Sequence, residues 1–205
     1  MKLVTYKNQN TSRLGILIED TIYDAAQSAH ENGFTKMPDN MRQFLIGGDE
    51  LMTTAKSIDA KIKSGELRIQ NSKFKIQNSS LDAPVPEPTS CRDGYAFRQH
   101  VASARRNRKV DMIPEFDEYP IFYFTNHNAI QGPGEIWCMP DHFQKLDFEL
   151  EAAVVIGKRG MNVKASEADK YIAGYMIMND MSARTLQMEE MLLNLGPAKG
   201  KDFST

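Results

Sequence analysis

Cysteine is scarce in this sequence, and charge of neither sign predominates. The 205 residues include 2 cysteines, Cys91 and Cys138, which lie far apart and form no CxxC pair. Their spacing indicates neither a zinc site nor a disulfide framework and favours a reducing, cytoplasmic setting. With 25 basic and 27 acidic residues the formal net charge is −2, which supplies no overall attraction toward nucleic acid or an anionic membrane. We therefore expect a small polar ligand as partner, and neither nucleic acid nor a membrane.

Long apolar runs are also lacking. No stretch approaches the roughly 20 residues needed to span a bilayer, and the N-terminus becomes polar within a few positions. We therefore expect neither a signal peptide nor a membrane anchor. A hydrophobic content of 41% is still enough to bury a core, in one domain or in one domain with a smaller neighbour.

The first part of the chain combines short strand patterns with helix patterns. Short β-branched and aromatic segments broken by polar turns predict an antiparallel meander over Lys2–Tyr6, Leu14–Glu19 and Thr21–Tyr23. Apolar spacing then predicts amphipathic helices over Asp39–Leu45 and Leu51–Ile62.

A proline-rich connector separates this part from the rest. Between Asn78 and Ser90, prolines at 84, 86 and 88 favour an extended chain. We place a domain boundary near residue 85, which gives an N-terminal domain over 1–85 and a second domain over 86–205.

The second part is predicted to be richer in strands. Alternating or apolar runs predict strands over Ile121–Thr125, Leu146–Ile156 and Gly174–Met178. Within Met161–Tyr171, Ser166 and the acids after it are typical of a helix start. The apolar spacing over Asn179–Leu195 is one that a helix could use. The whole pattern predicts an α+β fold that is mainly β.

The strand predicted over Leu146–Ile156 carries the most informative residues. Because side chains alternate along a strand, Asp147, Glu149 and Glu151 share one face, while Phe148 takes the other. Closely spaced carboxylates repel, and burying them is costly unless a cation or hydrogen bonds neutralise them. Oxygen ligands suit Mg²⁺ or Ca²⁺. A solvated acidic strand face is an equally good interpretation of this stretch alone.

Other candidates lie on either side of this strand. Asp180 ends a predicted apolar strand, where it could be a metal ligand or, by itself, the N-cap of the next helix. Asp93, Tyr95 and His100 fall within a short span, and His100 could be a base or a structural histidine. The nearby basic run is typical of a solvated helix face or of a carboxylate clamp; it comprises Arg98, Arg105, Arg106, Arg108 and Lys109.

Four sequence motifs from residue 85 onward resemble those of the fumarylacetoacetate hydrolase family in their residues and in their order. They are Arg92-Asp93-Gly94-Tyr95 with Arg98-Gln99-His100, Leu146-Asp147-Phe148-Glu149-Leu150-Glu151, Met178-Asn179-Asp180-Met181-Ser182-Ala183-Arg184 with Gln187, and Leu195-Gly196-Pro197-Ala198-Lys199-Gly200-Lys201-Asp202-Phe203. The resemblance implies a small N-terminal meander domain followed by part of the family's mixed β-sandwich or β-roll.

The resemblance also implies a metal site. It makes four carboxylates the ligands of Mg²⁺ or Ca²⁺, namely Asp93, Glu149, Glu151 and Asp180. Asp147 matches no ligand of the family, although it lies on the same strand face.

Further roles follow from the resemblance for residues around the metal site. His100 resembles the base that activates water, and Lys201 and Gln187 resemble groups that bind substrate oxygens and stabilise developing negative charge. The remaining positions resemble substrate-binding residues, namely Tyr95, Tyr123, Arg108 (with Lys109 as the alternative) and Arg184. Of these, Arg184 is expected to form a structural ion pair with the acidic cluster more than to take part in chemistry.

The activity implied is metal-dependent hydrolysis of a carbon-carbon bond in a 1,3-dicarbonyl acid such as fumarylacetoacetate or an acylpyruvate. The phrasing over Leu195–Lys201 is closer to the fumarylacetoacetate branch, which implies a place in tyrosine degradation. A decarboxylase or isomerase of a 2-oxo acid is the alternative within the family.

The resemblance carries two expectations about the whole protein. It implies a homodimer. Family members continue beyond residue 205 through strands that complete the β-roll and a glutamate that orients the histidine. A catalytically incomplete metal-binding fragment is therefore a further interpretation.

Overall fold

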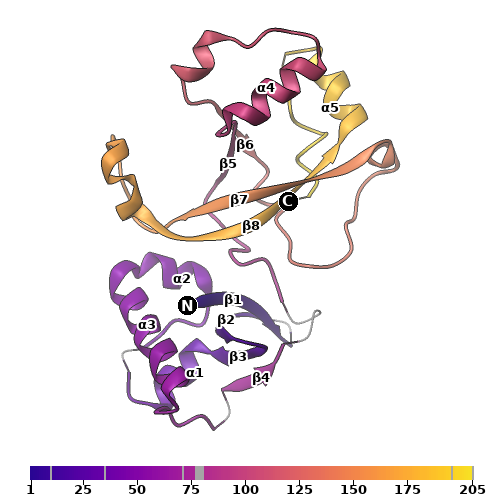
Figure 1. Cartoon of the computed structure of the whole chain (residues 1–205). Helices are drawn as coiled ribbons and strands as arrows, with labels where there is room; N and C mark the ends of the chain where they lie inside the picture. Colours follow the sequence, from indigo (N-terminus) through magenta and orange to yellow (C-terminus); the bar gives the residue numbers. More distant parts are fainter. Residues whose placement is uncertain (10, 35, 71, 77–80, 195, 205) are drawn as a thin grey trace.

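The N-terminal sheet is an antiparallel meander, as the strand patterns predict. The computed structural model describes residues 1–9, 11–34, 36–70, 72–76, 81–194 and 196–204. Its first strands pair in sequence order (Figure 1), and a short fourth strand completes the sheet in the order β1-β2-β3-β4. Their bounds are β1 Lys2–Asn8, β2 Thr11–Ile18, β3 Thr21–Asp24 and β4 Lys73–Lys75.

Helices pack on this sheet and enclose the hydrophobic core. The two predicted helices are observed as α2 (Met41–Ile46) and α3 (Gly48–Ser64). The sequence prediction missed α1 (Ala25–Glu31), which begins where the Asp24 carboxylate accepts a hydrogen bond from the backbone N–H of Gln27. The buried core cluster comprises Leu14, Ile16, Ala25, Ala29, Met37, Met41, Phe44, Ala55 and Ile58.

The connector after this core has little regular structure. Residues 81–90 form no helix or strand apart from an isolated bridge between Leu81 and Tyr6. The start of the predicted connector, Asn78–Ser80, lies outside the described residues. An ion pair of 2.7 Å between Lys158 and Asp49 of α3 joins the later part of the chain to the first. The domain boundary near residue 85 stays a prediction.

Two antiparallel strand pairs form the later part of the chain. The short pair joins β5 (Cys91–Gly94) to β6 (Phe122–Thr125), and the long pair joins β7 (Leu146–Ile156) to β8 (Ile172–Ala183). The strands predicted over Ile121–Thr125 and Leu146–Ile156 are thus observed, and the α+β class is confirmed.

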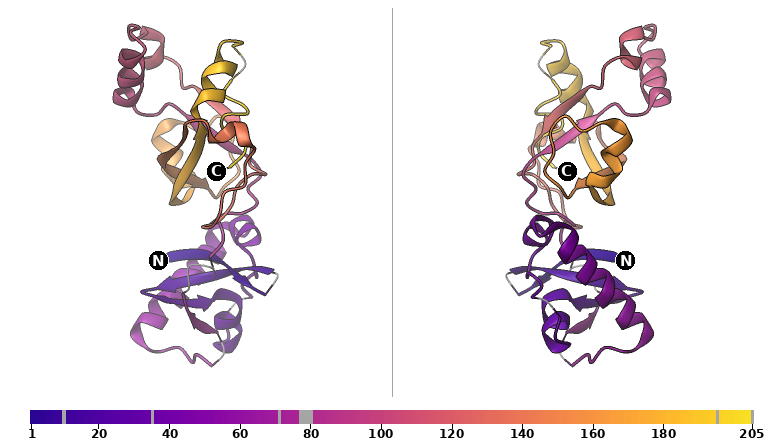
Figure 2. Two further views of the ribbon diagram at one scale, coloured as in Figure 1. Left: turned by 90° about the vertical axis from the view of Figure 1, so that its right-hand side faces the viewer. Right: turned by 90° about the vertical axis from the view of Figure 1, so that its left-hand side faces the viewer.

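The helices of this part lie beyond the strand pairs. They are α4 (Arg98–Asn107) and α5 (Arg184–Met191), with 3₁₀ turns η2 (Pro114–Asp117), η3 (Pro140–Phe143) and η4 (Ala165–Tyr171). The views in Figures 1 and 2 show α4 and α5 at one end of the molecule and the N-terminal sheet with its helices at the other.

Two sequence expectations differ from the structure. The helix expected over Asn179–Leu195 begins only at Arg184, because pairing with β7 continues β8 as far as Ala183. Asp180 therefore lies inside a strand and is not an N-cap, and Leu195 lies outside the described residues. The helix start expected near Ser166 is a 3₁₀ turn without a side-chain cap.

Within the ranges that the structure describes, no helix combines the length and the apolar character needed to cross a membrane.

Candidate metal centre

Strand pairing brings the acidic residues of β7 and β8 onto one face. Glu149 is the register partner of Asp180, and Glu151 is the partner of Met178. Directly paired residues share a face, so both glutamates lie on the same side as Asp180. Phe148 and Leu150 take the opposite face and are 65% and 73% exposed. The predicted alternation along β7 is thus confirmed.

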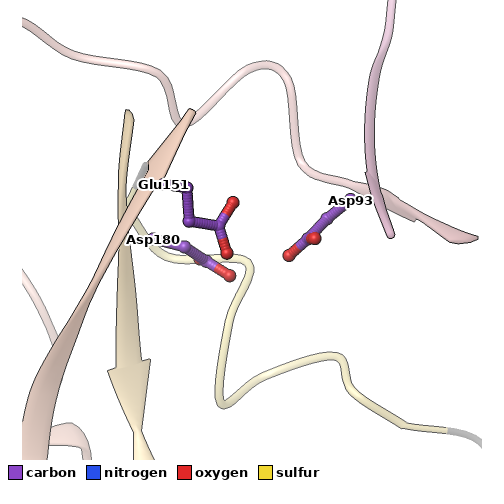
Figure 3. A group of neighbouring side chains, drawn as sticks. All are labelled: Asp93, Glu151 and Asp180. Carbon is purple, nitrogen blue, oxygen red and sulfur yellow. The ribbon is translucent and has the colours of Figure 1, made fainter. Parts of the chain in front are cut away.

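A third carboxylate reaches this face from the short strand pair. Asp93 on β5 pairs with Tyr123 on β6. One carboxylate oxygen each from Asp93, Glu151 and Asp180 lies within 4.8 Å of the others, and Figure 3 shows the three groups pointing toward one another. Residues from three strands that are distant in sequence therefore converge on one point.

The acids in this group repel one another. Burial first, and then the charges of Asp93, Asp180 and Glu149, raise the pKa of Glu151 to about 7. Burial also raises the pKa of Asp180 to about 6, although the ammonium of Lys201 acts in the opposite direction. The side chains of the protein thus leave negative charge at this point incompletely neutralised.

The donor set fits a hard divalent cation. The Oδ1 atom of Asp180 is buried and has no hydrogen-bond partner among the described residues, which is unusual for a buried carboxylate oxygen. Three carboxylates supply only oxygen ligands, which suit Mg²⁺, Ca²⁺ or Mn²⁺ better than Zn²⁺ or Cu²⁺. A cation at this point would neutralise Asp93, Glu151 and Asp180 and give the free Oδ1 atom a partner.

Glu149, the fourth predicted ligand, is held by two cations. Its Oε1 atom lies 2.6 Å from Nη1 of Arg184, and its Oε2 atom lies 2.6 Å from Nζ of Lys201. Burial acts to raise the pKa of Glu149, but hydrogen bonds from Lys201 and Arg184 outweigh burial and hold it below its usual value. Glu149 therefore borders the group of three as a neutralised neighbour.

The guanidinium of Arg184 links Glu149 to Asp147. Its Nε and Nη2 atoms donate to Oδ2 of Asp147 over 3.0 and 2.9 Å, and Nη1 also donates to Oε1 of Gln187 over 3.1 Å. The structure thus contains the ion pair expected between Arg184 and the acidic residues. Asp147 accepts its hydrogen bonds from Arg184 and is not one of the three converging carboxylates.

Lys201 and Tyr123 lie at the centre of the site. Lys201 is 3% exposed, and its Nζ atom lies 2.6 Å from Glu149 and 2.8 Å from Oδ2 of Asp180. The hydroxyl of Tyr123 lies 3.0 Å from Asp93 and 3.2 Å from Asp180. Burial, followed by these two negative charges, raises the pKa of Tyr123 well above its usual value, so the hydroxyl stays protonated.

Two predicted residues of α4 and its C-cap, His100 and Arg108, make no contact with this centre among the described interactions. His100 is exposed on α4 and lies against Tyr95, with ring centroids 6.3 Å apart. Within the described part of the chain no hydrogen bond joins His100 to the carboxylates. Arg108 caps the end of α4 and donates to its own helix, to the carbonyl of Ala104.

These residues nevertheless border the same open groove as the acidic centre. The sequence-predicted residues that line it are Asp93, Tyr95, His100, Arg108, Tyr123, Glu149, Glu151, Arg184, Gln187 and Lys201. Asp180 is not among the lining residues and is 1% exposed.

One residue of the site was missed from the sequence. Glu190 on α5 accepts hydrogen bonds from the loop that carries Lys201. Its spacing of three from Gln187 makes these two residues neighbours on the surface of α5, which is the signal that could have identified it.

Comparison with known proteins gives a family match over the later part of the chain. The sequence model described as fumarylacetoacetate (FAA) hydrolase C-terminal matches residues 89–205. This range contains all the predicted site residues.

Two curated relatives match nearly the whole chain. A fumarylacetoacetate hydrolase domain-containing protein 2 homolog of Dictyostelium discoideum is 33% identical over 209 residues, covering 100% of this chain and 61% of that protein. A protein of Xenopus laevis named a mitochondrial oxaloacetate tautomerase is 30% identical over 194 residues, covering 93% of this chain and 54% of that protein.

Solved structures show the same fold. A fumarylacetoacetate hydrolase from Exiguobacterium antarcticum aligns with a TM-score of 0.66 at 19% identity, over 100% of this chain and 62% of that one. A maleylpyruvate hydrolase from a Sphingobium strain, solved with manganese(II) and pyruvate, aligns with a TM-score of 0.59 at 20% identity, over 90% and 60%. The chain therefore spans between 54% and 62% of the length of these four proteins.

Proposed function

Because this chain belongs to the fumarylacetoacetate hydrolase family, we propose that it carries the metal-binding part of an enzyme acting on a small 1,3-dicarbonyl or 2-oxo acid. The observation that supports this most directly is the group formed by Asp93, Glu151 and Asp180, with carboxylate oxygens within 4.8 Å of one another. Mg²⁺ or Ca²⁺ is the proposed ion, and Mn²⁺ suits the same oxygen donors.

The residues around this group supply what an enolate-forming reaction needs. When bound, the divalent ion would polarise the oxygens of a dicarbonyl substrate. The buried ammonium of Lys201 would stabilise the negative charge that develops on a substrate oxygen, more strongly in the transition state than in the ground state. Tyr123 would keep its proton and donate a hydrogen bond, because its pKa is raised.

Hydrolysis of a carbon-carbon bond is the first candidate reaction. His100 would take a proton from the attacking water, and Lys201 with Gln187 would hold the oxygens of the departing enolate. His100 is exposed on α4 and lines the same groove as Asp93 and Glu151. Arg108, at the end of the same helix, would meet a substrate carboxylate.

Keto-enol tautomerisation of a 2-oxo acid is the second candidate. It is favoured by the Xenopus relative, 30% identical and named an oxaloacetate tautomerase. Tautomerisation also proceeds through an enolate, formed by removal of a proton from the intact 2-oxo acid, and it needs no attacking water, so Lys201 would keep its role. The assignment to the fumarylacetoacetate branch, and with it to tyrosine degradation, belongs to the first candidate alone.

The metal site is tested by calorimetric titration with Mg²⁺, Ca²⁺ and Mn²⁺. We expect Glu151→Gln to weaken binding by about 10- to 100-fold, because it removes a ligand. Asp147→Asn is the matched control, since it removes the same charge from the same strand face but from a side chain held by Arg184. Equal losses in both variants would contradict a defined site and indicate diffuse attraction to an acidic surface.

The reaction is tested by ultraviolet absorbance with fumarylacetoacetate, an acylpyruvate and oxaloacetate. Metal-dependent loss of the diketone absorbance that is abolished by His100→Ala would support hydrolysis. Metal-dependent conversion between the enol and keto forms of oxaloacetate, without cleavage of the diketones, would support the tautomerase. Metal binding without turnover of any of the three would identify a catalytically incomplete metal-binding fragment.

A further inference from the structure

We propose that Glu190 is a positioning residue that anchors the loop over 196–202 to α5 and so fixes the ammonium of Lys201 between Glu149 and Asp180. The functional consequence of this anchor rests on the proposed function, in which Lys201 contacts the substrate. The contacts between Glu190 and the loop do not depend on that function.

The carboxylate of Glu190 accepts two hydrogen bonds from the backbone of this loop. Its Oε1 atom lies 2.6 Å from the amide nitrogen of Ala198 and 3.2 Å from that of Gly200. A carboxylate that accepts bonds from backbone amides forms charge-assisted hydrogen bonds, which are roughly twice as strong as neutral ones. Both contacts lie within three residues of Lys201 in the sequence.

The loop transmits this anchor directly to Lys201. The amides of Lys201 and Asp202 both donate to the carbonyl of Ala198 over 2.8 Å, and the carbonyl of Gly200 accepts from the amide of Ala183 over 2.8 Å. The turn that Glu190 holds is therefore the turn from which the Lys201 side chain leaves.

The helix that bears Glu190 also carries the other cation at Glu149. Arg184 in the first turn of α5 contacts Glu149, and Glu190 lies in the last turn of the same helix. Arg184 and Lys201 contact different oxygens of Glu149 over 2.6 Å each. We infer that α5 sets the positions of both cations, one through its own side chain and one through Glu190.

The test measures how well the Lys201 amine is protected from an acylating reagent, without metal or substrate. Acetic anhydride labelling followed by peptide mass spectrometry gives the rate at each lysine. Lys199 lies on the same loop and is exposed, whereas Lys201 is 3% exposed. The ratio of the two rates therefore reports the position of Lys201 and cancels differences in reagent.

We expect Glu190→Ala to raise the labelling of Lys201 relative to Lys199 by about tenfold or more, because the loop opens more often once its anchor is gone. Glu190→Gln keeps an acceptor oxygen but loses the charge, so we expect an intermediate rise of about threefold. Glu189→Ala, which changes the exposed neighbour on the same helix, is expected to leave the ratio unchanged.

An unchanged ratio in folded Glu190→Ala and Glu190→Gln would overturn the proposal. A rise of the same size in Glu189→Ala would also overturn it, because the effect would then be general loosening of α5. If Glu190→Ala fails to fold, the ratio of Lys201 to Lys199 labelling in Glu190→Gln alone tests the proposal. The proposed function is judged separately. If the labelling is as expected but the protein shows no metal-dependent turnover, the anchoring role of Glu190 holds and the proposed enzymatic function is contradicted. If turnover is observed but the labelling ratio is unchanged, only the anchoring role is contradicted.

Discussion

At the scale of single residues, Asp24 joins several elements of the N-terminal part. Its carboxylate accepts hydrogen bonds from the hydroxyl of Tyr6, from Nε of Arg13 at 2.6 Å and from the amide of Gln27 at 2.7 Å. Burial acts to raise the pKa of Asp24, but these bonds outweigh it and hold the pKa below its usual value. The charged form of Asp24 is therefore the form that the fold stabilises.

This lowered pKa predicts acid sensitivity. Stability from Asp24 is fully present above about pH 4, its unfolded-state pKa, and is lost as pH falls through the lower folded-state pKa. We expect Asp24→Asn to lower the free energy of unfolding by about 3 kcal/mol at neutral pH. The free energy of unfolding of this variant should also fall less steeply as the pH is lowered below about 4. Urea unfolding from neutral pH to pH 2 measures both effects.

Asp39 provides the control for this prediction. It contacts the same Arg13 at 3.1 Å, but its side chain is 66% exposed. We expect Asp39→Asn to cost less than about 1 kcal/mol, because water screens an exposed ion pair. Equal losses from Asp24→Asn and Asp39→Asn would show that burial of the Asp24 carboxylate contributes nothing.

At the scale of elements, the packing of the 196–202 loop on α5 depends on a glycine. A Cβ atom at Gly200 would lie 2.7 Å from the amide nitrogen of Gln187 and 2.8 Å from its Cα. These are backbone atoms of a helix, which cannot move aside cheaply. The absence of a side chain at Gly200 therefore allows the loop to approach α5 closely enough for Glu190 to reach it.

We expect Gly200→Ala to lower stability by about 1 to 3 kcal/mol, because the added methyl group separates the loop from the helix. Gly174→Ala on β8 is the matched control, since a Cβ there meets no atom within 4 Å, and we expect it to stay within about 0.5 kcal/mol of the parent. Thermal unfolding of the two variants measures the difference. A Gly200→Ala protein as stable as Gly174→Ala would show that the loop has another way to sit on α5.

At the scale of the whole molecule, the long strand pair has one acidic face and one uncovered apolar face. The apolar face comprises Phe148, Leu150, Val154, Tyr175 and Ile177, each 49–75% exposed. At about 100 Å² each, these side chains present roughly 500 Å², which is near the upper end for a monomer surface and more than half of one side of a standard interface. The homodimer implied by the family resemblance stays a prediction, and this face is the surface that we propose for it.

We therefore expect concentration-dependent self-association, measured by light scattering across a dilution series. Leu150→Glu should shift the protein toward monomer, because it places a charge in the centre of the apolar face. Arg159→Gln, beyond the end of β7, changes the net charge by the same amount outside the apolar face and is the control. A protein that stays monomeric at the highest concentration would contradict the dimer.

Most of the local structure could be predicted from the sequence. Period-two alternation identified the strand over Leu146–Ile156 and assigned Glu149 and Glu151 to one face, because a strand places alternate side chains on opposite sides whatever its partner. The meander at the N-terminus was predicted from the same kind of pattern. Helix α1 was missed because its 7 residues are too few to show a clear helical period.

The composition of the site required the tertiary structure. The sequence offered Asp147, Glu149 and Glu151 as equivalent acids on one strand face and named Asp93 and Asp180 as further candidates. The resemblance to a family then selected all of them except Asp147. Which acids converge depends on strand register and on the packing of β5 against the long pair, and neither is encoded by spacing along one strand.

What the sequence determined by itself is therefore the local order: the α+β class, the faces of the strands, and the motifs that carry the family. What only the tertiary structure decided is how the charges are shared. It brings the carboxylates of Asp93, Glu151 and Asp180 together, and it places Glu149 in ion pairs with Arg184 and Lys201. The physical reason is that the interaction between charges depends on their separation and burial in space, which folding sets and sequence distance does not.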